Sequence, residues 1–201
     1  MSRCTRRLPV IITAGVLAAT TALTSCGSGS SPGSGSSSTS KETEAPLALT
    51  SPALARGHTI PARYTCDASN VSLPLRWTGV PSGTAELVVY ALEVVHRPGQ
   101  KRSGRVKAVV QWVVAGLSPA LPGIAAGKLP RGAIVGSNSV EHKSIYSICP
   151  AKGRTQEYVF AVFALPHRLV VKPGFKGGRL FRQINNSATA RATIIADYKR
   201  A

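Results

Sequence analysis

The sequence predicts a mainly β protein: an antiparallel β-sandwich with a few short helices, preceded by an N-terminal part that does not fold. Three observations lead to this class. Several runs are dense in β-branched and aromatic residues, pairs of turn-forming Pro and Gly separate them, and helical spacing of apolar residues is scarce. Strands also do not alternate regularly with helices, which argues against a parallel α/β arrangement.

The first 25 residues have the pattern of a bacterial lipoprotein signal peptide. Three Arg and no acid open the chain, and residues 8–23 are apolar or small without charge, interrupted by Pro9 and Gly15. This run is short for a membrane-spanning helix. Leu23 lies three residues before Cys26, with small residues between them. We therefore expect residues 1–25 to be removed and Cys26 to carry lipid, including a palmitate-type acyl chain. The alternative is an ordinary signal peptide with a chance cysteine.

Residues 26–46 are expected to form a flexible tether. Ser, Gly, Thr and Pro dominate this stretch. Such a composition buries too little apolar surface to become ordered. The remainder, residues 47–201, has the size of one domain with a single core. The predicted location is the cell membrane, lipid-anchored, on the extracytoplasmic face.

The chain is strongly basic, with a formal charge of +17, and the expected loss of three Arg leaves 17 − 3 = +14. A local cluster comprises Lys101, Arg102, Arg105 and Lys107. No nucleic-acid-binding module is evident and aromatic residues make up only 5% of the chain, so no nucleic-acid partner is expected. Anionic lipid headgroups or anionic wall polymers fit the charge better. A basic face that is simply solvated remains the alternative.

Two of the four cysteines remain once Cys4 leaves with the signal and Cys26 is acylated. In an oxidising compartment, Cys66 and Cys149 are expected to pair. Such a disulfide would close a loop of about 83 residues and contribute about 4 kcal/mol by the chain-entropy estimate. Two free buried thiols are the alternative.

Within the domain, the strongest strand patterns lie in four runs. They are Glu86–Val95, Val109–Val114, Tyr158–Leu165 and Ala192–Tyr198. The best helix candidate runs from Gly178 to Ala190, because Leu180, Phe181 and Ile184 would share one face.

Motifs of catalysis and metal binding are not found. The four histidines are scattered, without the spacing of a zinc site. A match to G-x-S-x-G at Gly29–Gly33 falls in the expected tether, where no nucleophile elbow can form. The sequence therefore predicts no enzyme activity, no metal and no cofactor.

An ordered series of motifs carries a family resemblance. It consists of Ile60-Pro-Ala-Arg-Tyr-Thr-Cys-Asp67, the block Asn70 to Thr84, Gln111-Trp-Val-Val114, Gly136-Ser-Asn138, Tyr146-Ser-Ile-Cys-Pro-Ala-Lys-Gly153 and Gln156-Glu-Tyr-Val-Phe160. In this order and spacing the chain resembles the phosphatidylethanolamine-binding protein family, in particular its bacterial Raf-kinase-inhibitor-like branch. The resemblance implies an antiparallel Greek-key β-sandwich with a pocket for small anions. It also supports the pairing of Cys66 with Cys149.

The residues expected at that pocket depart from the family pattern. The resemblance places Glu93, Gln111, Pro150, Gln156 and Tyr158 there. The family has two histidines where this chain has Gln111 and Gln156, and an acidic D-P-D loop where only Glu93 is acidic. Glutamine donates a neutral hydrogen bond in place of a charge-assisted one. Either the pocket takes another ligand, or it has lost binding.

Together these features predict a lipid-anchored, extracytoplasmic binding protein with an altered anion pocket. The alternative is a module that binds a protein, such as a peptidase inhibitor, without a small-molecule ligand. Candidate partners are the membrane through the lipid anchor, an anionic ligand or wall polymer, and a protein.

Overall fold

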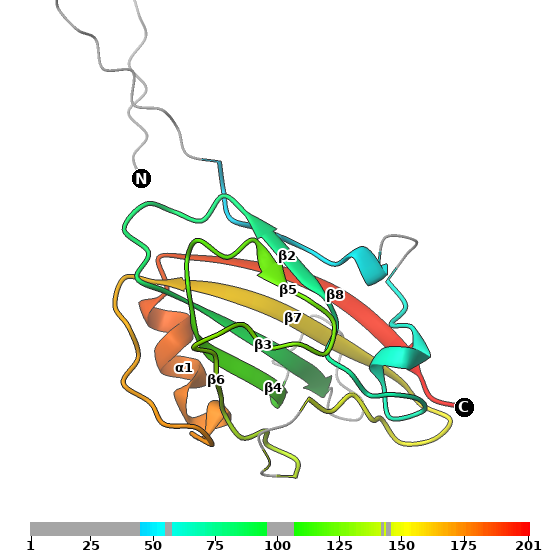
Figure 1. Ribbon diagram of the computed structural model, residues 1–201. Coiled ribbons are helices and arrows are strands. Elements are labelled where there is room, and N and C mark those ends of the chain that lie inside the picture. Colours follow the sequence, from blue (N-terminus) through cyan, green and yellow to red (C-terminus); the bar gives the residue numbers. More distant parts are fainter. Residues whose placement is uncertain (1–44, 55–57, 96–106, 142, 144–145) are drawn as a thin grey trace, which may run out of the picture. The chain divides into compact units, whose positions relative to one another are not determined.

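The computed structural model describes residues 45–54, 58–95, 107–141, 143 and 146–201 (Figure 1). Cys26, the expected signal and residues 26–44 of the expected tether lie outside these ranges, as does the basic cluster except for Lys107. The division at residues 25 and 46 therefore stays a prediction. In the described part, no helix is both long and apolar enough to cross a bilayer.

Two antiparallel sheets form the domain. The smaller sheet has the order β1-β2-β5, with β1 Ala48–Thr50, β2 Leu75–Thr78 and β5 Gly123–Ile124. The larger has the order β6-β4-β3-β7-β8, with β6 Ile134–Val135, β4 Lys107–Leu117, β3 Glu86–Val95, β7 Thr155–Leu165 and β8 Ala190–Lys199. Two 3-10 turns, Pro52–Leu54 and Ala62–Tyr64, and one helix, α1 at Gly177–Ser187, complete it. The predicted class is confirmed.

The four predicted strands are all present, and β3 has the predicted bounds. The predicted end of the helix at Ala190 is wrong. Ala188 already has an extended backbone, and the Thr189 N–H donates to the Ala164 carbonyl of β7, so the chain joins the sheet at Ala190. The short strands β1, β2, β5 and β6 were not predicted, because two to four residues give little periodicity.

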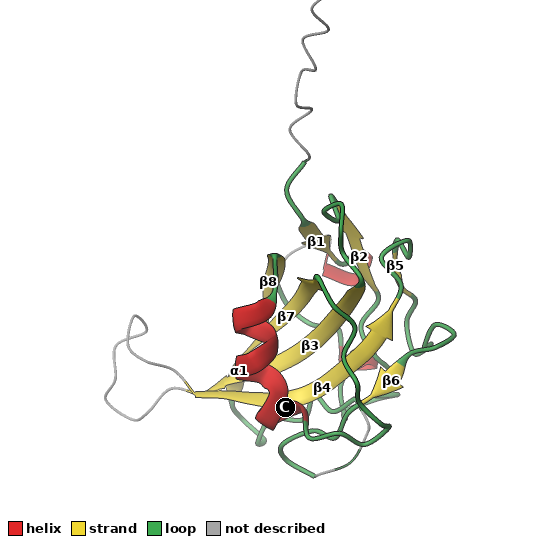
Figure 2. Cartoon of the chain, turned by 90° about the vertical axis from the view of Figure 1, so that its left-hand side faces the viewer, coloured by secondary structure: helices red, strands yellow, loops and turns green. Residues whose placement is uncertain are grey.

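The larger sheet is covered on both faces, which explains the continuous apolar run of β3. One face packs against the smaller sheet through residues such as Val89, Trp112 and Phe160. The other face packs under α1, where Tyr90, Phe163 and Phe181 meet edge to face. Figure 2 shows α1 on one side of β3, β4 and β7, and the small sheet on the other. A sheet buried on both faces lacks the polar-apolar alternation of a half-exposed one.

The buried carboxylate of Glu86 connects three segments of the chain by hydrogen bonds. Glu86, only 3% exposed, opens β3 and accepts hydrogen bonds from the N–H groups of Gly116 and Leu169, at 2.7 and 2.8 Å. Gly116 has φ of +74° at an irregularity where β4 carries an extra residue opposite β3. This left-handed conformation favours glycine. Glu86 thus fixes the bulge of β4 to the loop that precedes α1.

Candidate functional site

A β-bulge places Gln111 at one end of the larger sheet. The register passes from Ala91 opposite Trp112 to Leu92 opposite Val110, so Gln111 is an extra residue without a partner on β3. Bulges bend a strand and redirect a side chain, and they occur often beside functional sites. Without this bulge, strict alternation would place Gln111 on the face opposite Trp112.

Glu93, Gln111 and Tyr158 come together at this bulge. Glu93 is opposite Tyr158 in the register of β3 with β7, so both side chains lie on the face toward the small sheet. The amide nitrogen of Gln111, which is 4% exposed, donates a hydrogen bond to the Glu93 carboxylate. The Tyr158 hydroxyl is buried and has no hydrogen-bond partner within the described residues. Three residues expected at the pocket therefore lie together, and one polar group there is unsatisfied.

The acidic groups of this site have raised pKa values. Burial raises the pKa of Glu93, and the hydrogen bond from Gln111 offsets part of that rise. Burial also raises the pKa of Tyr158, and the negative charge of nearby Glu93 adds to the effect. The ion pairs of the described residues join Lys143 to Glu141 and Arg200 to Asp67, and none includes Glu93. The described groups thus provide no fixed positive charge beside Glu93.

Gln156 precedes Tyr158 by two residues on β7, but its amide nitrogen is hydrogen-bonded within the protein. Its nitrogen donates to the carbonyl oxygens of Val94 and Glu157. Gln156 also lines a mainly polar cavity of about 300 Å³ at the end of the sheet, together with Arg154 and Asp197. The amide nitrogens of Gln111 and Gln156 therefore both donate to protein oxygens.

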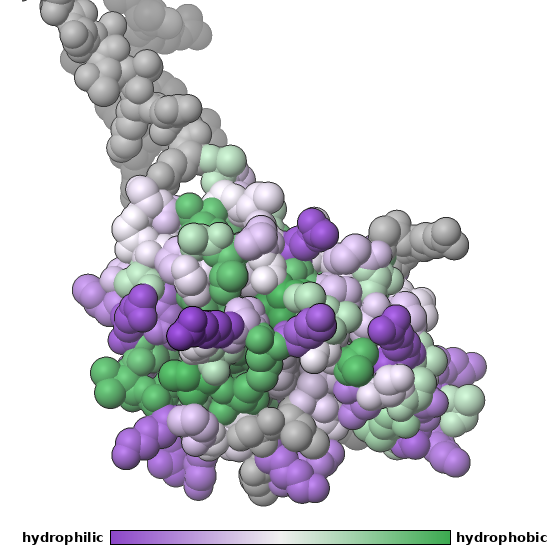
Figure 3. Space-filling model, viewed as in Figure 1, coloured by the Kyte–Doolittle hydropathy of each residue, from purple (hydrophilic) through white to green (hydrophobic). Residues whose placement is uncertain are grey.

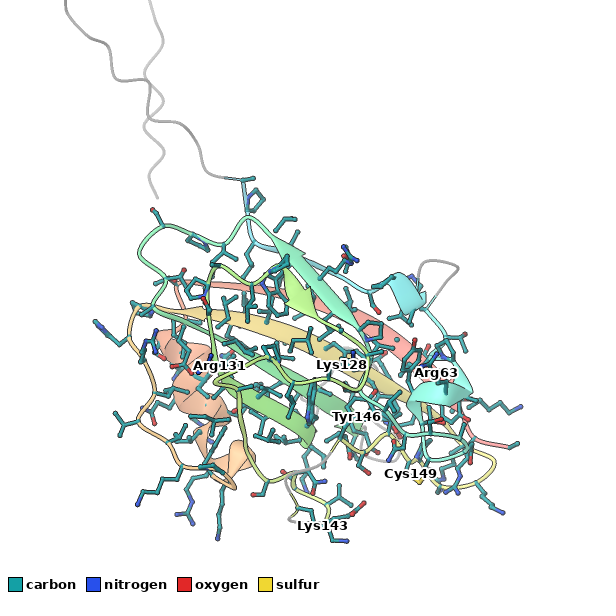
Figure 4. All side chains as sticks on the ribbon, viewed as in Figure 1. Arg63, Lys128, Arg131, Lys143, Tyr146 and Cys149 are labelled. Carbon is teal, nitrogen blue, oxygen red and sulfur yellow. A yellow bond between two sulfur atoms is a disulfide. The ribbon has the colours of Figure 1, made fainter. Side chains whose placement is uncertain are left out.

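Pro150 lies beside the disulfide, on the loop that closes this end of the sandwich. Cys66 and Cys149 are bonded, with their Cα atoms 5.2 Å apart, as predicted. The Cys66 N–H also donates to the Ile148 carbonyl. The Pro150 carbonyl accepts a hydrogen bond from the Arg200 guanidinium at 3.2 Å. Figure 4 shows Tyr146 and Cys149 on this loop.

An ionic contact next to the disulfide was not predicted. The Asp67 carboxylate accepts hydrogen bonds from the Tyr198 hydroxyl at 2.6 Å and from Arg200 at 2.9 Å. The bond from Tyr198, followed by Arg200, lowers the pKa of Asp67. These partners are separated from Asp67 by more than 130 residues, and no local pattern pairs them. The contact ties the end of β8 to the Cys66 turn.

Tyr146 is a second residue whose role was not predicted. Its ring packs edge to face on Trp112, with centroids 5.5 Å apart. Burial raises its pKa, the backbone of Leu73 offsets part of that rise, and Tyr158 and Tyr64 lie close enough to add to it. Tyr146 therefore lies near Tyr158, which in turn lies near Glu93. No group of three or more His, Cys, Asp or Glu that could hold a metal occurs in the described residues.

Comparison with known proteins agrees with this geometry. The sequence model for "Phosphatidylethanolamine-binding protein" matches residues 50–199. LppC of Mycobacterium tuberculosis (strain ATCC 25618 / H37Rv), whose name describes it as a lipoprotein, is 31% identical over 155 residues, which cover 77% of this chain and 73% of LppC. A UPF0098 protein of Methanothermobacter thermautotrophicus is 30% identical over 146 residues, covering 70% of this chain and 91% of the relative.

Two solved structures share the fold. The homologue CT736 of Chlamydia trachomatis has a TM-score of 0.64 at 25% identity, covering 78% of this chain and 99% of the other. E. coli YbcL has a TM-score of 0.64 at 24% identity, covering 78% and 100%. The match of the sequence model across the sandwich, from β1 to the end of β8, shows that the chain belongs to the phosphatidylethanolamine-binding protein family.

Proposed function

We propose that this protein is a lipid-anchored binding protein of the cell envelope, whose family pocket takes a neutral polar group in place of an anion. The observation that carries the proposal is the meeting of Glu93, Gln111 and the unpartnered Tyr158 hydroxyl. A buried hydroxyl without a partner is costly, and a ligand that bonds to it recovers that cost.

The preference for a neutral group follows from the charges. A phosphate placed beside Tyr158 would face the Glu93 carboxylate, while the nitrogens of Gln111 and Gln156 already donate to protein oxygens. A neutral ligand with hydroxyl or amide groups can donate to Glu93 and accept from Tyr158 without repulsion. The activity proposed is binding, in keeping with a family named for binding.

Anchoring and location have separate support. The Leu23-Thr-Ser-Cys26 pattern and the name of the relative LppC favour a lipid anchor. The Cys66–Cys149 disulfide favours an oxidising compartment outside the cytoplasm.

Calorimetry on the purified full chain in mild detergent tests the ligand class. The probes are N-acetylglucosamine as a neutral envelope sugar, phosphoethanolamine and inorganic phosphate, each against wild type and Tyr158→Phe. We expect heat from the neutral sugar that Tyr158→Phe reduces at least about three-fold, as for a lost hydrogen bond. If phosphate gives the only heat that Tyr158→Phe abolishes, the family's anion preference has persisted. If no probe responds to that substitution, the protein-binding alternative gains support.

A further inference from the structure

A second polar site lies on the opposite face of the larger sheet, where α1 begins. Lys176 precedes the helix without a side-chain cap, and the first turn contains no acidic residue. The Gly177 N–H donates to the Ser137 carbonyl, and the Arg179 N–H donates to the Lys176 carbonyl. The Gly178 N–H has no acceptor among the described residues. A free N–H at a helix N-terminus, together with the helix dipole, attracts an anion.

A cavity of about 200 Å³ lies at this helix start. Residues 137–139 and 176–179 line it. Glycine at position 178 keeps the space open, because a Cβ there would come within 2.9 Å of the Ser139 hydroxyl oxygen. The free N–H and the hydroxyl therefore border the same small volume.

Asn138 supplies an independent indication of a ligand. This residue lines the cavity and is only 2% exposed. Its carbonyl oxygen accepts a hydrogen bond from the Glu141 N–H at 2.8 Å, whereas its amide nitrogen is buried without a partner. Buried donors in native proteins are almost always satisfied. An acceptor inside the cavity would satisfy this one.

The surrounding charge selects an anion. No acidic residue occurs between Glu157 and Asp197, a stretch that includes α1 and the loop before it. Six cations lie in it: Arg168, Lys172, Lys176, Arg179, Arg182 and Arg191. Two of these, Lys176 and Arg179, line the cavity. Figure 4 shows nitrogen-tipped side chains extending from this orange segment, and Figure 3 shows hydrophilic side chains bordering a hydrophobic patch on the same side of the surface.

We propose that a phosphate group binds at the N-terminus of α1. The Gly178 N–H, the Asn138 amide and the Ser139 hydroxyl would donate to its oxygens, with Lys176 and Arg179 balancing its charge. Several convergent donors and two cations fit a phosphate monoester or diester. The site is distinct from the Glu93 group, which lies on the other face of the sheet. The phosphate can belong to a soluble ester or to a lipid headgroup.

Asn138→Asp is the sharpest test. It keeps the oxygen that accepts from Glu141 and replaces the free donor with a charged acceptor. The full chain, labelled with ¹⁵N and held in mild detergent, is titrated with inorganic phosphate and with glycerol 3-phosphate. We expect saturable shifts of the Gly178 amide signal and at least ten-fold weaker binding in Asn138→Asp. The exposed double variant Lys176→Gln/Arg179→Gln should also bind at least five-fold more weakly and retain the fold. Arg182→Gln, on the same helix but not lining the cavity, is the control and should bind like wild type.

Sedimentation with vesicles containing phosphatidylglycerol distinguishes a phosphate on a lipid headgroup from a phosphate on a soluble ester. Loss of sedimentation in Lys176→Gln/Arg179→Gln, but not in Arg182→Gln, identifies a lipid headgroup. Saturable binding of glycerol 3-phosphate without such a loss identifies a soluble ester. The proposal is overturned if the Gly178 signal does not shift, if only signals near Gln111 move, or if Asn138→Asp and the double variant bind phosphate as tightly as wild type.

Discussion

Gln111 donates a hydrogen bond to Glu93 across β4 and β3, and this contact exists because a bulge adds one residue to β4. The bond lets a glutamine occupy a place where the family has a histidine. It also uses one of the two N–H donors of the Gln111 amide. The site therefore differs from the family pattern in the side chains that can donate to a ligand.

Restoring both histidines should restore anion binding at this site. We expect Gln111→His/Gln156→His to bind phosphate about ten-fold more tightly than wild type below pH about 6.5, because an imidazolium donates a charge-assisted hydrogen bond. Calorimetry in an Asn138→Asp background excludes the contribution of the α1 site. Equal affinity with and without the histidines would mean that the rim no longer admits an anion.

The carboxyl of Glu93 should make stability depend on pH in a defined direction. Burial raises the pKa of Glu93 in the folded state. Below the unfolded value of about 4.3, the carboxyl is protonated in both the folded and the unfolded protein, so it costs no stability. As pH rises through the folded pKa, ionisation of the buried group destabilises wild type. Glu93→Gln removes this loss, so its unfolding free energy relative to wild type should increase from about pH 3.5 to about pH 7.

Asp67→Asn provides a control of opposite sign for that experiment. The Tyr198 hydroxyl and Arg200 lower the Asp67 pKa, so wild type gains stability from this group as pH rises through the folded pKa, and the gain is complete above the unfolded value. Relative to wild type, Asp67→Asn should therefore lose stability over the same range. Urea unfolding at both pH values measures both variants. A change of the same sign in both would contradict the assignment of the two pKa shifts.

Strand periodicity was sufficient to predict the four long strands but not the register between them. The run at Glu86–Val95 has the composition of a buried strand, and its bounds were predicted correctly. The bulge at Gln111 has no local signature, because an extra residue is defined only relative to the partner strand. Glu93 and Tyr158 were placed near each other through family resemblance. The contact of Asp67 with Arg200 depends on tertiary structure alone.

The disulfide should contribute measurably to stability. Cys66 and Cys149 enclose a loop of 83 residues. Replacing both with Ser should lower the unfolding free energy by about 4 kcal/mol, because the unfolded chain regains loop entropy. Chemical denaturation of both proteins without reductant measures the difference, and mass spectrometry of non-reduced peptides verifies the bond in wild type. Reductant should destabilise wild type and leave the double variant unchanged. Detection of free thiols at both positions in wild type would contradict the pairing.

Removal of the predicted acylation site should release the protein from the membrane. Cys26→Ala, expressed in a bacterium that processes lipoproteins, should move the protein from the membrane fraction to the soluble fraction. The matched control is Cys4→Ala, which changes a cysteine within the expected signal and should leave membrane retention intact. Retention of an exported Cys26→Ala protein would show that something other than the predicted lipid holds it.

Removal of the buried Glu86 side chain should lower the free energy of unfolding strongly. Its carboxylate satisfies the N–H groups of Gly116 and Leu169, and both would lose their acceptor in Glu86→Ala. Each unsatisfied buried donor costs about 1–3 kcal/mol, so the loss of both acceptors should lower the unfolding free energy by about 2–6 kcal/mol. The same substitution at Glu141, which pairs with exposed Lys143 and accepts one hydrogen bond from the Ser147 hydroxyl, should cost less than Glu86→Ala. Equal losses at the two positions would mean that Glu86 does not hold the bulge to the loop before α1.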